Sequence, residues 1–385
     1  MMPLSARLIA TVVLLFVGLA GPAAAQVFET RAARAILIDV ETDTVLFQRE
    51  ADARTPPASM AKLMTMAVVF DALKTGKLSL DDEFQVSENA WRTGGASSGG
   101  STMFAKLGSS IKVDDLIHGI IIQSANDGCI VMAEGMAGTE ATFAQMMNAE
   151  ARKLGLTGSH FKNATGLPDP DQYVTARDLA RLAKHIIVDF AEFYPIYGQT
   201  EFIWNGIRQR NRNPLLEMNI GADGLKTGFT EESGYGLVGS AVRAGQRIVL
   251  VINGTKSEKE RAEEARKLMD WGFRAFERVN FFADGEVIGE ANVFGGDQGG
   301  VGLVSKGSID VLLPRGSRDQ IKGSIVYQGP VQAPVEAGRE IGKLELTVNE
   351  QVLREAKVYA ATDVGVGNTR QRAVDGLQEL LLGWW

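Results

Sequence analysis

Ser59 and Lys62 stand three residues apart, and their side chains could support nucleophilic catalysis. The pair follows two prolines and opens an apolar-periodic run, so the sequence predicts a helix that begins near Ser59. Three residues make almost one helical turn, which places the amine of Lys62 on the same face as the hydroxyl. A serine hydroxyl is a poor nucleophile unless a base takes its proton, and a lysine with a lowered pKa can be that base.

The Ser-x-x-Lys spacing alone is a weak signal. It also occurs at Ser109 to Lys112 and at Ser159 to Lys162, and most such pairs lie on a solvated helix face. Two more motifs can be set beside the first: Ser124-Ala125-Asn126 in a turn-like polar break, and Lys226-Thr227-Gly228. The similar Lys74-Thr75-Gly76 ends a helix, where the glycine serves as a C-cap. Lys226-Thr227-Gly228 instead runs toward a strand, where Gly228 lets a ligand approach the backbone closely.

The composition is that of a core-forming protein long enough for two domains, with 385 residues, 45% hydrophobic and 23% charged. The formal net charge of −7 gives no electrostatic basis for binding nucleic acid. The single cysteine, Cys129, has apolar neighbours and is predicted to be a buried small hydrophobe rather than a nucleophile. The histidines have no ligand-like spacing, which argues against a zinc site or a Ser-His-Asp triad.

The N-terminal segment, residues 1–25, is typical of a cleaved secretion signal. Arg7 precedes the apolar run from Leu8 to Leu19, and the small residues that a signal peptidase requires follow at 22–25. The apolar run is short for a membrane span, although an uncleaved anchor is the alternative. We therefore expect an exported protein whose mature chain starts near Gln26.

The C-terminal segment, residues 367–385, contains an amphipathic helix candidate from Arg370 to Trp385. Its apolar residues recur at helical spacing, and the segment is too short to span a bilayer. The leucine-rich face and the terminal Trp384-Trp385 suit the interface between lipid heads and tails, so we predict attachment to a membrane surface. A terminal helix docked on its own protein is the alternative.

The elements that must position the motifs are expected to form an α/β domain over residues 26–279. Residues 35–39 with 44–47, and residues 234–241 with 247–252, are β-rich and predict two hairpins. Strands at both ends of this region would share one antiparallel sheet, with the helices packed on it.

Helical periodicity fills the middle of that domain. The pattern predicts helices near 116–121, over 141–154 and over 176–188, and Ser257 with Glu260 forms a capping box for a helix that reaches about Phe276. Beyond this helix the sequence changes to short β-like runs punctuated by Gly and Pro. These runs predict a small all-β domain of sandwich or barrel type over residues 280–366, with the role of a spacer or platform.

The three motifs in this order resemble those of the D-alanyl-D-alanine carboxypeptidases among the low-molecular-mass penicillin-binding proteins. The resemblance covers nearly the whole chain, including the signal, the trailing β-domain and the terminal helix. The matching stretches are Pro57–Lys62, Ser124–Asp127, Asn205–Gln209 with Asn211–Asn213, and Asp223–Gly228 with Ser233–Tyr235. The resemblance implies a serine β-lactamase/transpeptidase-like fold, no metal and no organic cofactor. It also implies a periplasmic enzyme attached peripherally to the outer face of the cytoplasmic membrane.

The resemblance implies that Ser59 attacks the carbonyl between the two terminal D-alanines of a peptidoglycan stem peptide and forms an acyl-enzyme, with Lys62 as the base. Ser124 would relay a proton toward the leaving amine, and Asn126 would hold Lys62 and the substrate's peptide group. We expect a second cation, Lys226, to lie close to Lys62 and to lower its pKa. β-Lactam antibiotics would acylate the same serine.

Binding of the substrate is expected to involve the edge of the strand after the third motif. The resemblance implies an oxyanion hole formed by the backbone N–H groups of Ser59 and Phe229. It also implies that Lys226 and Thr227, together with Arg212, bind the free carboxylate of the last D-alanine.

Two positions depart from the family pattern. Many members carry His after Lys-Thr-Gly, where this chain has Phe229, and many carry His before Gly-Leu, where this chain has Thr165. A serine pair found in some members is reduced here to Ser101 with Thr102, whose role the sequence leaves open.

Three alternatives to the carboxypeptidase remain at this point. A β-lactamase would share the fold and the nucleophile but needs a base for fast deacylation, and no Glu stands out for that role. A D,D-endopeptidase of the same superfamily would use the same residues. A pseudoenzyme that only binds peptidoglycan would have lost Ser59, Lys62 or Lys226, and the chain keeps all of them.

Overall fold

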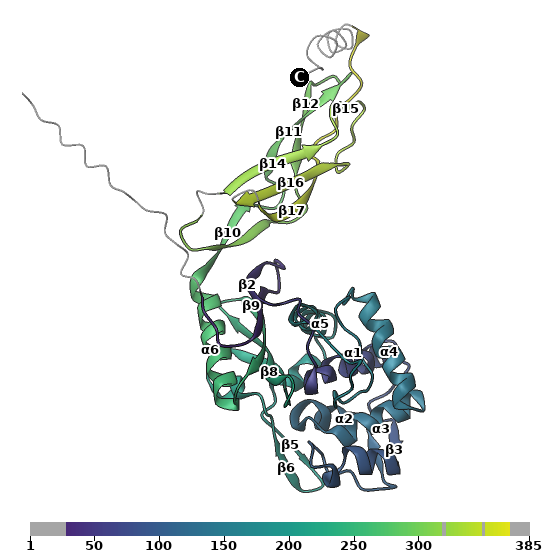
Figure 1. Ribbon diagram of the computed structural model, residues 1–385. Helices are drawn as coiled ribbons and strands as arrows, with labels where there is room; N and C mark the ends of the chain where they lie inside the picture. The colour runs from purple at the N-terminus through teal and green to yellow at the C-terminus, as the bar shows by residue number, and fades with distance from the viewer. Residues whose placement is uncertain (1–27, 318–320, 349–350, 370–385) are drawn as a thin grey trace, which may run out of the picture.

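The computed structural model describes residues 28–317, 321–348 and 351–369. The predicted secretion signal and the segment from Arg370 to Trp385 lie outside the described residues. Figure 1 shows an α/β domain and an all-β domain joined end to end. The predicted fold class is confirmed for these two parts.

One five-stranded antiparallel sheet organises the α/β domain, in the order β2-β1-β9-β8-β7. Its strands are β1 (Arg34–Asp39), β2 (Val45–Arg49), β7 (Ala222–Thr230), β8 (Gly234–Arg243) and β9 (Gln246–Thr255). Both predicted hairpins, β1–β2 and β8–β9, are confirmed. Strand β7 lies at the edge of the sheet and carries the third motif, so one side of that motif is open for a ligand.

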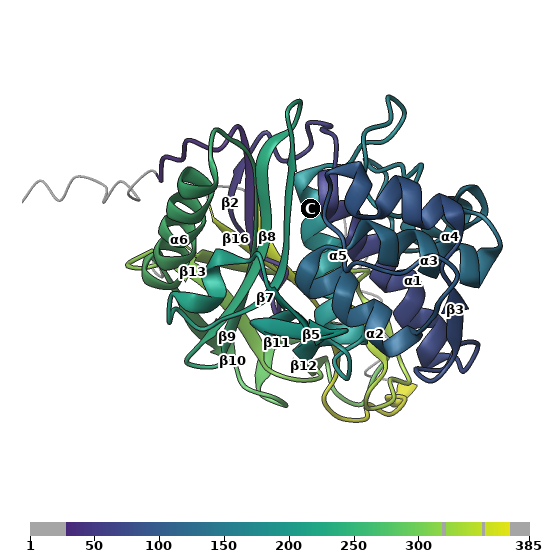
Figure 2. The ribbon, with the colours of Figure 1, turned by 90° about the horizontal axis from the view of Figure 1, so that it is seen from below.

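Helices cover both faces of this sheet, and the alternation of side chains along β9 shows why. Val249 and Val251 join the core beneath the helical region, whereas Leu250 and Ile252 join the core beneath helix α6 (Glu258–Ala275). Figure 2 shows α6 on one side of the sheet and the other helices on the opposite side. Because side chains of a strand alternate between faces, a strand buried on both sides reads as a continuous apolar run.

The helical region supplies the first two motifs. Its elements are the 3₁₀ turn η1 (Ala58–Ala61), α1 (Lys62–Lys74), α2 (Val113–His118), the π turn η4 (Gly119–Gln123), α3 (Asn126–Ala137), α4 (Glu140–Lys153) and α5 (Ala176–Asp189). The predicted helices near 116–121, over 141–154 and over 176–188 are therefore confirmed, with the first continued by the π turn. Thr175 caps α5, since its hydroxyl accepts a hydrogen bond from the backbone N–H of Asp178 at 3.1 Å.

Short elements connect these helices to the sheet. They are β3 (Glu83–Gln85), η2 (Ala90–Gly94), η3 (Ala96–Ser98), β4 (Ser110–Lys112), η5 (Tyr194–Gly198), β5 (Glu201–Trp204), β6 (Ile207–Arg210) and η6 (Pro214–Glu217). The β5–β6 hairpin was not predicted from the sequence. It matters for the site because the amide of Gln209 donates to the backbone carbonyl of Met103 at 3.3 Å, which ties the hairpin to the segment before the second motif.

The all-β domain begins with β10 (Phe276–Phe282), which follows α6 without an intervening loop. Its strands form a six-stranded sheet, in the order β14-β16-β17-β12-β11-β15, and a separate pair β10–β13. The other bounds are β11 (Val287–Phe294), β12 (Gly300–Val304), β13 (Ile309–Pro314), β14 (Ile321–Tyr327), β15 (Val331–Gln332), β16 (Glu340–Val348) and β17 (Gln351–Ala360). An ion pair of 2.6 Å between Arg278 and Glu41 links the two domains. The predicted boundary at 279/280 stays a prediction.

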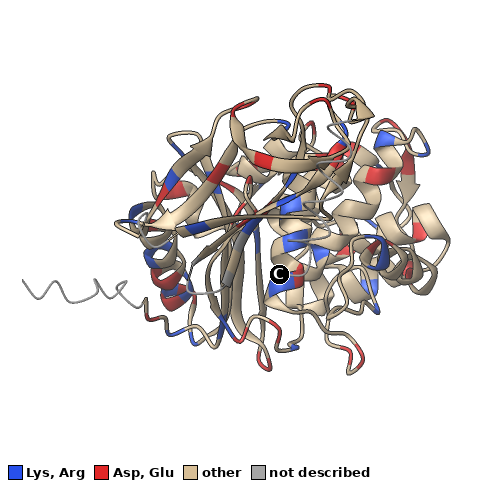
Figure 3. Cartoon of the chain, turned by 90° about the horizontal axis from the view of Figure 1, so that it is seen from above, with Lys and Arg blue, Asp and Glu red and all other residues tan. Residues whose placement is uncertain are grey.

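Acidic and basic side chains are interspersed over both domains (Figure 3). Within the described ranges, no helix combines the length and the apolar character needed to cross a bilayer. The same residues contain no group of three or more His, Cys, Asp and Glu side chains arranged to hold a metal ion. Cys129 is buried in the core of the helical region, as predicted.

Candidate active site

The first motif lies where the 3₁₀ turn η1 passes into α1. Ser59 belongs to the turn and Lys62 is the first residue of the helix. Their side chains meet as the spacing predicts, because the Nζ of Lys62 donates to the Oγ of Ser59 at 3.0 Å. The decoy Lys112 instead forms an exposed ion pair with Asp81 at 2.9 Å.

Lys62 is buried and fully engaged. Its side chain is 1% exposed, and its Nζ also donates to the Oδ1 of Asn126 at 2.8 Å and to the backbone carbonyl of Thr165 at 2.6 Å. The pKa of Lys62 is lowered from 10.5 to about 8, mainly by burial, and the charge of Arg212 contributes to this shift. A substantial fraction of this amine is therefore neutral near pH 8, as a base for Ser59 requires.

Lys226 is the second buried lysine of the site. Burial and the charge of Lys62 hold its pKa well below the ordinary value. We expected Lys226 to lower the pKa of Lys62. The main cause of the lowered pKa is instead the burial of Lys62. Two ammonium groups in one poorly solvated region repel each other, and an anionic ligand would relieve that repulsion.

The second motif crosses the junction between the π turn η4 and α3. Ser124 has φ +66°, a left-handed conformation uncommon for residues other than glycine. Its Oγ is buried and has no hydrogen-bond partner in the described structure. A buried hydroxyl without a partner is destabilising by about 1–3 kcal/mol, so this hydroxyl is available to a ligand at the site.

Asp127 holds the segment 101–105 against the start of α3, and the sequence did not single it out for a role. Its carboxylate accepts hydrogen bonds from the hydroxyl of Thr102 at 2.5 Å and from the backbone N–H groups of Met103 at 3.0 Å, Ala105 at 3.0 Å and Gly128 at 2.9 Å. The hydroxyl of Thr102, whose role the sequence left open, therefore helps to hold this segment through Asp127. The sequence feature that could have indicated a role for Asp127 is its position as an acidic residue in the first turn of a helix.

The loop 163–167 packs directly on the turn η1, which carries Ser59. Gly166 has φ +82°, and a Cβ at that position would lie 1.8 Å from the carbonyl oxygen of Ala58. The side chain of Asn163 fixes this loop, since its Oδ1 accepts from the hydroxyl of Thr165 at 2.9 Å and from the backbone N–H of Gly166 at 2.8 Å. The side chain of Thr165 is thus used by the loop, and only its carbonyl contacts Lys62.

Strand β7 runs beside the same turn. A Cβ on Gly228 would lie 3.1 Å from the Cγ of Met60 and 3.2 Å from the Cβ of Ala58, so glycine lets strand and turn approach closely without displacing either. Phe229 is half exposed and stacks on Tyr235 with ring centroids 4.2 Å apart.

A cavity of about 370 Å³ brings the motifs together. Seven of the nine predicted site residues line it, whereas Lys62 and Lys226 are buried and do not. The seven are Ser59, Ser124, Asn126, Arg212, Thr227, Gly228 and Phe229. Most of the site residues predicted from the sequence therefore share one cavity, although they come from distant parts of the chain.

Helix α6 adds residues that the motifs did not reveal. Glu258 and Arg261 of this helix line the cavity, beside Tyr235 of strand β8. The guanidinium of Arg261 lies 5.7 Å from the centroid of the Tyr235 ring, and its buried Nε has no partner among the described residues. Arg212 donates to the hydroxyl of Ser101 at 2.7 Å. Arg212 and Arg261 line the same cavity, and burial lowers the pKa of both guanidinium groups, so the cavity is suited to an anionic group.

Known proteins match both domains. The profile of peptidase S11, described as D-alanyl-D-alanine carboxypeptidase, matches residues 21–257, and that of the C-terminal domain of penicillin-binding protein 5 matches residues 276–366. The D-alanyl-D-alanine carboxypeptidase DacC of Escherichia coli K12 is 38% identical over 353 residues, which cover 91% of this chain and 88% of that relative. DacA of the same organism is 35% identical over 353 residues, with the same coverage of 91% and 88%.

Solved structures of known proteins also resemble this chain. Penicillin-binding protein 5 from Haemophilus influenzae is 35% identical, with a TM-score of 0.79, and the match covers 88% of this chain and 99% of that chain. Penicillin-binding protein D2 from Listeria monocytogenes, solved in its ampicillin-bound form, is 29% identical with a TM-score of 0.57 over 64% of this chain and 99% of that chain. Taken with the shared cavity of the three motifs, these matches show that the chain belongs to the peptidase S11 family of D-alanyl-D-alanine carboxypeptidases.

Proposed function

We propose that this serine carboxypeptidase removes the terminal D-alanine from peptidoglycan pentapeptide stems through an acyl-enzyme on Ser59. The observation that carries the assignment of residues is the contact of 3.0 Å between the hydroxyl of Ser59 and a buried amine, Lys62, whose pKa is lowered to about 8. An alcohol beside a base that is partly neutral at this pH is the arrangement that serine acylation requires.

In the acylation step, the Oγ of Ser59 attacks the carbonyl carbon of the penultimate D-alanine while the Nζ of Lys62 takes the hydroxyl proton. The peptide C–N bond breaks, and the leaving amine of the last D-alanine takes a proton through Ser124, whose buried hydroxyl has no other described partner. Asn126 keeps Lys62 aimed at the nucleophile through the contact of 2.8 Å. The product is an ester on Ser59.

Binding of the free carboxylate is assigned to the cations at one end of the cavity. Arg212 and Thr227 line it, and Lys226 lies buried behind it. An arriving carboxylate would relieve the repulsion between Lys226 and Lys62 that lowers the pKa of Lys226. The oxyanion of the tetrahedral intermediate is assigned to the backbone N–H groups of Ser59 and Phe229.

Deacylation uses the same groups in reverse. A water molecule attacks the ester carbonyl, Lys62 takes a proton from this water, and Ser59 recovers its proton as the shortened peptide leaves. With a β-lactam, the amide bond that breaks lies within a ring, so the leaving nitrogen stays attached to the acyl group. The ester then persists, and the antibiotic blocks the enzyme.

The test compares the wild type with Ser59→Ala and with the control Ser109→Ala, which alters the serine of a Ser-x-x-Lys decoy that does not line the cavity. We expect labelled penicillin to attach covalently to the wild type and to Ser109→Ala but not to Ser59→Ala, and the release of D-alanine from a peptide ending in two D-alanines to follow the same order. Release that survives Ser59→Ala would refute the mechanism.

We also propose where the enzyme works. Residues 1–25 would direct export and be removed, residues 26–279 would carry the chemistry in the periplasm, and residues 280–366 would act as a platform. Residues 367–385 would hold the enzyme at the outer face of the cytoplasmic membrane through their Leu-rich and Trp-ended apolar face.

A further inference from the structure

The backbone of Ala164 is held from two sides, by helix α4 and by helix α1. Its N–H donates to the Oε1 of Glu140 at 3.3 Å, and its carbonyl accepts from the hydroxyl of Thr65 at 2.7 Å. The next carbonyl along the chain, that of Thr165, accepts from the Nζ of Lys62 at 2.6 Å. An acceptor of the catalytic lysine is therefore oriented by a carboxylate that does not itself line the catalytic cavity.

We propose that Glu140 is a positioning residue for Lys62: its carboxylate keeps the loop 163–167 in place beside the amine, and its negative charge favours the protonated amine over the neutral one. Glu140 thereby raises the pH at which the enzyme becomes active. This inference rests on the mechanism proposed above, in which Lys62 is the base for Ser59.

The start of α4 places this carboxylate. Glu140 is the first residue of the helix and follows the N-cap Thr139, whose hydroxyl accepts from the backbone N–H of Thr142 at 3.1 Å. An acidic side chain in the first turn is stabilised by the helix dipole. Helix α4 packs against both α1 and α3, and its first turn meets the loop 163–167 at Ala164. The fold thus holds a carboxylate at a defined place next to the loop that contacts Lys62.

The charges of Glu140 and Lys62 act on each other. Burial is the main cause of the lowered pKa of Lys62, and the charge of Glu140 opposes that shift. Burial raises the pKa of Glu140 above its ordinary value of 4.5, and the charge of Glu134 adds to this rise, whereas the N–H of Ala164 and the charge of Lys62 oppose it. Because the ordinary value is far below pH 7, the carboxylate keeps its charge in the range where Lys62 titrates.

Other titratable groups also face the amine of Lys62. They are Cys129 and Asp127 of α3, Arg212, and Lys226 of β7. The thiol of Cys129 is neutral, because burial raises its pKa to about 12. Asp127 accepts four hydrogen bonds, three of them from the segment 101–105, so its substitution would disturb a second part of the site. Glu140 is therefore the carboxylate near Lys62 that can be neutralised with the smaller disturbance of the fold.

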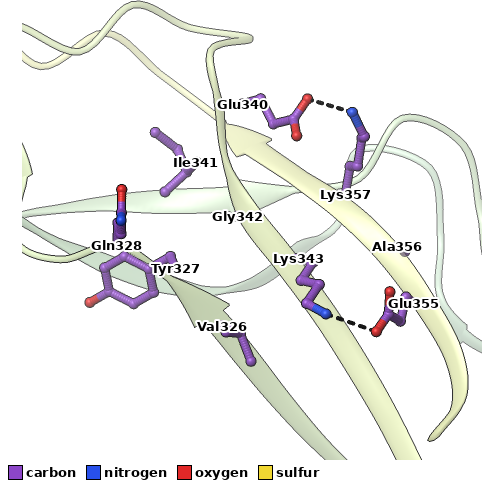
Figure 4. Close-up of a pocket in the computed structure, with 10 residues that line it drawn as sticks. All are labelled: Val326, Tyr327, Gln328, Glu340, Ile341, Gly342, Lys343, Glu355, Ala356 and Lys357. Atoms are coloured by element: carbon purple, nitrogen blue, oxygen red, sulfur yellow. Dashed lines mark hydrogen bonds and ion pairs between the residues drawn. The ribbon is translucent and has the colours of Figure 1, made fainter.

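Other carboxylates of the protein are paired directly with a cation. In a cavity of about 660 Å³ on strands β14, β16 and β17 of the all-β domain, for example, Lys343 contacts Glu355 at 2.8 Å (Figure 4). Glu140 forms no such contact with a cation in the described part of the chain. Its charge can therefore act over a longer distance on Lys62, through a poorly solvated region where screening by salt is weak.

The experiment measures the second-order rate of penicillin labelling from pH 6 to pH 10 for the wild type, Glu140→Gln and Glu140→Ala. Glutamine keeps an oxygen that can accept from the N–H of Ala164 but carries no charge, whereas alanine removes both. Glu150→Gln is the matched control, because Glu150 lies on the same helix and pairs with Lys153 at 2.6 Å. Thermal melting verifies that each variant is folded, and Glu140→Gln alone tests the charge where the alanine variant does not fold.

We expect the midpoint of the pH profile to fall by about half a pH unit in Glu140→Gln, because the lost negative charge no longer favours the protonated amine. The plateau at high pH should stay within about twofold of the wild type, since a slightly weaker base costs little in rate. In Glu140→Ala the plateau should be about tenfold lower, because the loop no longer holds the carbonyl of Thr165 in place. Glu150→Gln should keep the wild-type profile.

A midpoint in Glu140→Gln equal to that of the wild type would overturn the role of the charge. A plateau in Glu140→Ala equal to that in Glu140→Gln would overturn the role in holding the loop. Both results would leave the assignments of Ser59 and Lys62 intact. A wild type that penicillin labels at no pH would instead overturn the proposed function, and this inference with it.

Discussion

The pKa of Lys62 can be tested through the pH dependence of acylation. In the proposed mechanism Ser59 is acylated only when Lys62 is neutral, so the second-order rate of penicillin labelling should follow the neutral fraction of this amine. With a pKa of about 8, that fraction rises from about one-tenth at pH 7 to about nine-tenths at pH 9. The rate should therefore increase about tenfold over this range and then level off.

The variant Lys62→Met removes the base and keeps an apolar side chain of similar length. We expect it to lose about 100-fold or more in acylation rate and to show no rise centred near pH 8. Lys112→Met is the matched control, because Lys112 occupies the same position in an exposed decoy pair. A wild-type profile that is flat from pH 6 to pH 10, or a rise near pH 8 that persists in Lys62→Met, would refute the assignment of the base.

The same pKa has a consequence for stability. Lys62 has a pKa of about 8 when folded, against 10.5 as its ordinary value, so between these values the unfolded chain binds more protons. The free energy of unfolding should accordingly rise with pH through this window. Below a pH of about 8, the folded protein carries the full cost of burying the protonated Lys62. The shift corresponds to about 3 kcal/mol. Between pH 7 and pH 10.5, the free energy of unfolding of the wild type relative to that of Lys62→Met, measured from melting curves, should rise by about 3 kcal/mol. A stability difference between the two proteins that is independent of pH would contradict the burial argument.

Three further predictions concern other parts of the chain. Gly166→Ala should lose about 3 kcal/mol or more in thermal or urea unfolding, because its Cβ would lie 1.8 Å from a carbonyl oxygen, whereas Gly138→Ala, with φ +77° and nothing within 4 Å, should lose only about 1 kcal/mol. Asp127→Asn should lose about 2 kcal/mol and slow penicillin labelling, because the carboxylate accepts four hydrogen bonds, three of them from the segment 101–105; unchanged labelling would show that this segment does not position the site. Truncation after Val366 should abolish co-sedimentation with lipid vesicles and preserve D-alanine release, and binding that persists would exclude the terminal segment as the anchor.

The sequence predicted the parts of the site that depend on local geometry. Ser59 and Lys62 meet because a spacing of three residues is almost one helical turn, and the two hairpins formed where β-rich runs flank short turns. The resemblance to a known family added Arg212 and Phe229, whose positions in the cavity no local pattern could have indicated.

The contacts that depend on the path of the chain were not predictable. Arg261 reaches the cavity because α6 packs beside β8, and nothing in its own neighbourhood distinguishes it from a surface arginine. The cause of the lowered pKa of Lys62 was assigned to Lys226, although burial is the larger effect. Burial of a side chain depends on the whole fold. A residue pattern could therefore indicate the charged neighbour of Lys62 but not the loss of water around its amine.

The contact between Lys62 and Thr165 has a consequence for how this enzyme can evolve. The acceptor at 2.6 Å is a main-chain carbonyl, which every amino acid carries, so proton transfer places no demand on the identity of the side chain at this position. The neighbouring Gly166 is constrained by its backbone and by the space around it. Position 165 is therefore constrained through the loop contacts of its hydroxyl and not through Lys62, so a substitution that the loop accommodates would leave the hydrogen bond to Lys62 in place.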